Sequence, residues 1–192
     1  MADPVTRTAH DDAPLSSAKH PDAAAAGLQA RSDDTLLGHT VSINRPRSEL
    51  YAFWRDFSHL AAFMENVHSV TVQTPSRSHW VIAGPAGRTV EWDSEITEDV
   101  PDERIAWASL EGADVRNSGA VEFRDSPSGR GTFVTVTIAY DPPVGELGRF
   151  VAKLLRREPK IQARQDLRRF KQLMETGEIP TASGPRAAPR AQ

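Results

Sequence analysis

Apolar and polar side chains alternate over most of residues 67–140. Residues 89–100 give the clearest example, because one side of the alternation takes Val90, Trp92, Ser94 and Ile96. Successive side chains of a strand point to opposite faces, so this pattern predicts strands with one buried face. Turn residues such as Gly, Pro, Asp and Ser separate the alternating stretches. We therefore predict an antiparallel meander, with strands near residues 68–73, 78–83, 89–100, 104–109, 118–125 and 131–140.

Two short helices are predicted before this meander, after a first strand at residues 37–43. Residues 46–57 begin with a proline suited to the first turn of a helix and carry one apolar stripe, made of Leu50, Phe53, Trp54 and Phe57. Ser58 resembles an N-cap that starts a second helix, whose stripe is Leu60, Phe63, Met64 and Val67. One uninterrupted helix through Ser58 is the alternative. The aromatic stripe is interpreted as core, or in part as the closure of a cavity.

The last regular stretch, residues 146–177, is predicted to be a long helix with a break at Pro159. Its apolar stripe is Ala163, Leu167, Phe170 and Met174, and Gly177 suits the position just after a helix. A second stripe is entirely basic: Lys153, Arg157, Lys160, Arg164, Arg168 and Lys171. This stripe is interpreted as a solvated face or as a contact with an anionic membrane surface. Nucleic acid is the least favoured partner, because no aromatic platform accompanies the charge.

Composition excludes several kinds of site. The chain has no cysteine, which removes disulfides and thiolate metal sites, and its net charge is −3. No metal-ligand spacing is present, so we expect neither a metal nor a cofactor. The first residues have no basic and apolar signal pattern, and no apolar run is long enough to cross a membrane, so a cytoplasmic location is expected. We predict disordered tails at residues 1–35 and 179–192 around one domain at residues 36–178.

The order of predicted elements is strand, two helices, a run of six strands and a long helix. This is an α+β arrangement in which the last helix lies on one face of a curved antiparallel sheet. A bent sheet that holds a helix leaves space between the two layers. Binding sites favour such concave and mostly apolar spaces.

Four segments in this order resemble a known family: FWRDFSHLAAFMENVHSV, EWDSEITEDVPDERIAWASL, GRGTFVTVTIAYDPP and DLRRFKQLMETGEIPT. They are similar to the bacterial polyketide cyclase/dehydrase-type branch of the START and birch-pollen-allergen superfamily, also called SRPBCC, over residues 37–181. The resemblance implies a helix-grip fold with a deep apolar cavity between sheet and C-terminal helix. It also implies binding of lipids, sterols, quinones or polyketides, and in a few relatives cyclisation or dehydration. No settled catalytic motif comes with it.

Candidate residues for the cavity wall are the large apolar side chains on the strand faces and the last helix: Trp80, Ile82, Trp92, Trp107, Phe123, Phe150, Leu167 and Phe170. Ordinary core is the alternative interpretation of each. The carboxylates Glu91, Asp93 and Glu95 are expected on the solvated face, and no histidine has an evident catalytic partner.

Three functions follow for such a domain. The leading hypothesis is the binding, and in some settings the carriage, of a hydrophobic small molecule. The alternative is a cyclase/dehydrase-like (aromatase-like) enzyme with histidine and carboxylate groups at its cavity. The third is an interaction protein whose cavity is merely core.

Overall fold

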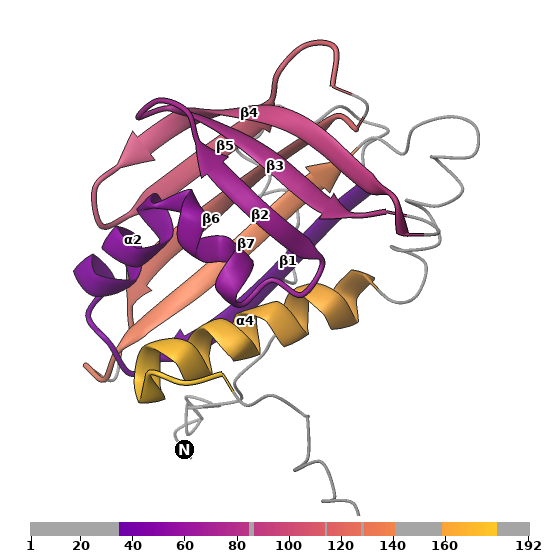
Figure 1. Ribbon diagram of the computed structural model, residues 1–192. Helices are drawn as coiled ribbons and strands as arrows, with labels where there is room; N and C mark the ends of the chain where they lie inside the picture. The colour runs from indigo at the N-terminus through magenta and orange to yellow at the C-terminus, as the bar shows by residue number, and fades with distance from the viewer. Residues whose placement is uncertain (1–34, 85–86, 114, 128, 141–158, 180–192) are drawn as a thin grey trace, which may run out of the picture.

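Seven antiparallel strands form one curled sheet in the computed structural model, which describes residues 35–84, 87–113, 115–127, 129–140 and 159–179. The strands are β1 (Thr35–Ile43), β2 (Val67–Val72), β3 (Arg77–Ala83), β4 (Thr89–Val100), β5 (Arg104–Ser109), β6 (Asn117–Asp125) and β7 (Thr132–Tyr140). Their spatial order is β1-β7-β6-β5-β4-β3-β2, so the first strand closes onto the last. Figure 1 shows α4 (Pro159–Thr176) lying along the sheet beside β1. The predicted α+β helix-grip arrangement is confirmed.

The inner face of the sheet, which packs against the helices, carries the large side chains. On β5, Ile105 and Trp107 point to this face, whereas Ala106 and Ala108 point to the outer face. All four side chains are buried. β5 therefore alternates large and small residues rather than apolar and polar ones.

The two short helices differ in kind from the prediction. α2 (Arg47–Arg55) is a regular helix, but the next segment is a single 3₁₀ helix, η1 (Phe57–Ala62). Asp56 takes an extended backbone conformation between them, and its carboxylate accepts from the Ser58 backbone N–H at 3.0 Å and from the Ser58 hydroxyl at 2.6 Å. The hydrogen bond from the Ser58 side chain is the main cause that lowers the pKa of Asp56. The uninterrupted helix is therefore wrong, and Asp56 rather than Ser58 is the cap.

α4 begins at Pro159 and ends as the sequence indicated. Gly177 has a φ of 77° and its N–H donates to the Leu173 carbonyl at 2.8 Å, which closes the helix in the left-handed conformation that glycine tolerates. Leu167, Phe170 and Met174 are buried against the sheet. The predicted helical residues 146–158 lie outside the described residues. So do the predicted tails, apart from Thr35 in β1 and residue 179.

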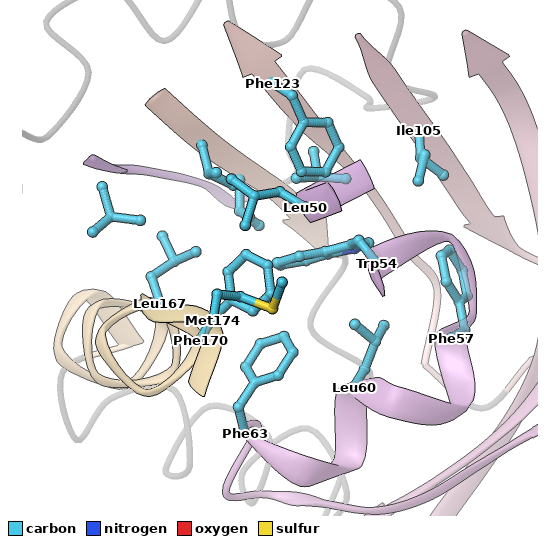
Figure 2. Packing of buried hydrophobic residues seen from close by; sticks show 14 of the residues in the cluster. Leu50, Trp54, Phe57, Leu60, Phe63, Ile105, Phe123, Leu167, Phe170 and Met174 are labelled. Atoms are coloured by element: carbon cyan, nitrogen blue, oxygen red, sulfur yellow. The ribbon is translucent and has the colours of Figure 1, made fainter. Parts of the chain in front are cut away.

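Aromatic rings fill the space between α2, η1, α4 and the sheet (Figure 2). Trp54 of α2 meets Phe170 of α4 edge to face, with ring centroids 5.0 Å apart, and also contacts Phe63 at 5.4 Å. Phe57 packs edge to face against Trp80 and Trp107 of the sheet. Such pairs add ~0.5–1.5 kcal/mol each beyond simple burial. This end of the inner face is thus a packed core.

Polar contacts fasten the helices to the corners of the sheet. The guanidinium of Arg45 donates to the Met174 carbonyl at 2.7 Å and to the Glu175 carbonyl at 3.1 Å, at the end of α4. These carbonyls have no partner within the helix, and the positive charge is favourable at a helix C-terminus. At α2, Tyr51 and Arg55 both donate to the carboxylate of Asp99 on β4, at 2.5 and 2.7 Å.

Candidate functional site

The hairpin of β3 and β4 sets the two faces of the candidate site. Its register pairs Trp80 with Trp92 and His79 with Asp93, so tryptophans share the inner face and the polar pair shares the outer face. The two indole rings are nearly parallel, with centroids 6.0 Å apart and an angle of 7° between planes. Trp80 donates its indole N–H to the Ser78 hydroxyl at 2.9 Å.

Burial differs from place to place along the inner face. Trp80 and Trp107 are each 6% exposed beneath Phe57, whereas Trp92 and Ile82 are only partly buried. Trp92 and Ile82 pack against a second small cluster, made of Val90 and Val115. The inner face therefore offers a partly accessible apolar wall at the end that α2 and η1 do not cover. This wall, made of Ile82, Val90, Trp92 and Val115, is called the distal wall below.

The other predicted wall residues occupy the packed core. Phe123, Leu167 and Phe170 are at most 3% exposed and contact α2, α4 and the sheet from the inside. Phe150 lies outside the described residues. Among the candidates that the structure describes, Ile82 and Trp92 are thus the two that stay partly accessible.

A polar pocket lies on the outer face of the same hairpin. His79 Nδ1 is 2.9 Å from an Asp93 carboxylate oxygen, and His79 Nε2 is 3.5 Å from Glu91. Gln73 donates to Asp93 at 3.2 Å. Trp92 and residues 110–113 of the β5–β6 loop complete the lining of a pocket of ≈ 340 Å³. The carboxylates lie on the outer face as predicted, but the histidine between them was not anticipated.

Of the predicted basic stripe, the structure describes the side chains of Arg164, Arg168 and Lys171. The two arginines are exposed. Lys171 instead donates to the Ser42 carbonyl at 2.7 Å and pairs with Glu175 at 3.5 Å, so it serves the attachment of α4 to β1. The side chains of Lys153, Arg157 and Lys160 lie outside the described residues. Contact with an anionic membrane stays a prediction.

Sequence reasoning did not select two inner-face residues. Phe57 closes the packed end against Trp80 and Trp107, and only its membership of the α2 stripe signalled this. His39 is 6% exposed on β1, in the same alternation as Val41 and Ile43. That alternation was the available signal for its inward position.

The described ranges contain neither a metal-binding cluster nor a membrane-spanning helix. No group of three or more His, Asp or Glu side chains is arranged there to hold a metal ion. No helix of this part of the chain has the length and apolar character needed to cross a membrane.

The comparisons with known proteins agree with this architecture. A 17.2 kDa protein encoded between melC2 and rnhH in Streptomyces lincolnensis is 30% identical over 141 residues, which cover 71% of this chain and 87% of the relative. A solved structure from Deinococcus radiodurans is 42% identical, with a TM-score of 0.62, and the match covers 75% of this chain and 100% of that one.

An aromatase/cyclase from a Streptomyces species has the same fold, with a TM-score of 0.58 over 77% of this chain and 99% of the other. Its sequence identity is only 16%, so this likeness concerns the fold alone. Residues 43–168 match the family described as polyketide cyclase / dehydrase and lipid transport. The chain belongs to this family.

Proposed function

We propose that the protein binds a hydrophobic small molecule, such as a lipid, a quinone or a polyketide, between the inner face of the sheet and α4. The observation that carries this proposal is the distal wall, where Trp92 and Ile82 stay partly accessible while Trp80, Trp107 and Phe123 are buried. The family, whose description includes lipid transport, supports the same function. Carriage of the bound molecule follows if the ligand is released to a second protein or a membrane.

The distal wall suits an apolar guest on physical grounds. Burial of apolar area stabilises a complex by roughly 25 cal/mol per Å², and an aromatic surface adds ~0.5–1.5 kcal/mol through stacking. Trp92 offers an aromatic surface that is already held in place by its parallel contact with Trp80. A fixed ring loses little conformational entropy when a ligand binds.

The experiment that tests the proposal is a titration with the neutral fluorophore N-phenylnaphthylamine. We expect saturable binding to the folded protein. Trp92→Leu should weaken it several-fold, because the wall stays apolar but loses stacking area. Glu91→Ala is the matched control, since Glu91 neighbours Trp92 on β4 but faces outward. Absence of saturable binding, or equal binding by Trp92→Leu and wild type, would overturn the proposal.

A cyclase/dehydrase-like activity is the second candidate function, and the pair of His79 and Asp93 in the outer pocket favours it. A histidine held by a carboxylate is a suitable general base. His79 and Asp93 face away from the tryptophans, although Trp92 also lines this pocket, so His79 is the residue whose substitution separates the two functions. Probe binding that is lost in His79→Ala but kept in Trp92→Leu would move the site to the outer pocket.

A further inference from the structure

The indole N–H groups of this protein differ in whether they have a partner. Trp80 donates to the Ser78 hydroxyl at 2.9 Å. The indole nitrogens of Trp92 and Trp54 are buried, and neither has a hydrogen-bond acceptor among the residues that the structure describes. Trp80 and Trp92 therefore stack on each other on one face, but only Trp80 has a hydrogen-bond acceptor for its indole N–H.

An unpaired buried donor is costly. A buried N–H without an acceptor loses its hydrogen bonds to water and gains none in return, and the indole N–H of a buried tryptophan usually finds a partner. A phenylalanine at position 92 would supply a ring without that cost. The donor at Trp92 thus needs an explanation that packing alone does not give.

Trp92 and Trp54 differ in what surrounds their indole rings. Trp54 is 1% exposed and is enclosed by the rings of Phe63, Phe123 and Phe170, so its indole faces an aromatic interior. Trp92 is only partly buried and belongs to the distal wall. Of the two indole N–H groups that lack an acceptor among the described residues, that of Trp92 is the one beside the proposed ligand.

We infer that the Trp92 indole N–H donates to an oxygen acceptor of the bound molecule. The inference rests on the proposed function and narrows its ligand class. The ligand is an apolar compound with a carbonyl or phenolic oxygen within reach of the distal wall, rather than a pure hydrocarbon chain. Because Nε1 itself is covered, the acceptor reaches it by displacing neighbouring side chains.

Fluorene and fluorenone provide the test, since the two tricyclic molecules are close in size and differ by one carbonyl group. Each is titrated against bound N-phenylnaphthylamine, and the ratio of the two dissociation constants is compared between variants. We expect Trp92→Phe to reduce the preference for fluorenone over fluorene about tenfold, which corresponds to about 1.4 kcal/mol. Fluorene affinity should change little, because the aromatic wall remains.

Trp80→Phe is the matched control. It removes an indole N–H from the same stack, but one that is already bound to Ser78. The fluorenone preference should therefore survive this substitution. In a ¹⁵N-labelled wild-type protein, the indole resonance of Trp92 should also move downfield with fluorenone and not with fluorene.

The outcomes separate the two ideas. If both probes bind but Trp92→Phe keeps the preference, or the Trp92 resonance does not move, the inference is overturned and the proposed function stands. If N-phenylnaphthylamine binds but neither fluorene nor fluorenone displaces it, the inference fails and the proposed function stands; if N-phenylnaphthylamine does not bind either, both fail. Should Trp92→Phe not fold, the resonance shift in the wild-type protein decides the inference by itself.

Discussion

The indole ring of Trp107 lies across the backbone of Gly119 on the neighbouring strand. The two residues are direct partners in the β5–β6 register, and a Cβ atom at position 119 would overlap the six-membered ring of the indole. Gly119 therefore gives Trp107 room to lie against the sheet, where Phe57 packs on it. Because glycine has no Cβ atom, the Trp107 side chain can lie directly against the backbone at position 119.

Gly119→Ala should lower the free energy of unfolding by ~1–3 kcal/mol, because the new methyl group forces Trp107 from its position. Urea unfolding followed by circular dichroism measures this loss. In a Trp107→Phe background the same substitution should cost clearly less, since the smaller ring leaves space. An equal cost in both backgrounds would mean that the glycine is needed for another reason.

Phe170→Ala should lower the free energy of unfolding by ~3–5 kcal/mol, because it removes a fully buried ring and leaves a cavity among Trp54 and Phe63. Arg168→Ala, on the exposed side of α4, should cost less than ~0.5 kcal/mol. Chemical denaturation measures both variants. Similar losses for the two would place the wrong face of α4 against the sheet.

Tyr51 should make the protein lose stability in strongly alkaline solution. Burial, and then its hydrogen bond to Asp99, raise the pKa of Tyr51 from 10.0 to about 12. The unfolded chain therefore releases this proton at lower pH than the folded protein does. The stabilising contribution is complete below pH 10 and is lost as the pH rises toward 12. The titration of Tyr51 is measured by tyrosinate absorbance, as the difference between the wild-type protein and Tyr51→Phe. A Tyr51 pKa near the ordinary value of 10 would contradict the prediction.

Alternation along the strands predicted the faces of the sheet correctly because it depends only on local geometry. Val90, Trp92 and Ile96 face inward and Glu91 faces outward, as their order along β4 indicated. Pairing between strands is different, since it depends on the turn that joins them. No local pattern stated that His79 would lie opposite Asp93, so the outer pocket could not be predicted.

A bulge in β4 changes the face of the strand on which Asp99 lies. Simple alternation places Asp99 on the outer face with Glu91 and Asp93. The register shifts between Ile96 and Glu98, so that Asp99 pairs with the inward-facing Ile105 and reaches Tyr51 and Arg55 of α2. One extra residue in a strand reverses the faces beyond it. Bulges of this kind have no reliable signal in a single sequence.

The pairing of β1 with β7 sets the order in which a growing chain is able to mature. Thr35 pairs with Tyr140 and Ile43 pairs with Thr132, so the first strand leaves the ribosome well before its partner exists. Arg45 follows this strand, and its acceptors, the carbonyls of Met174 and Glu175, are synthesised much later. Contacts so distant in sequence slow folding. During synthesis the rings of Trp54 and Phe63 therefore lack the cover of Phe170 until the last helix arrives, and this interval is when the nascent protein most needs protection from aggregation.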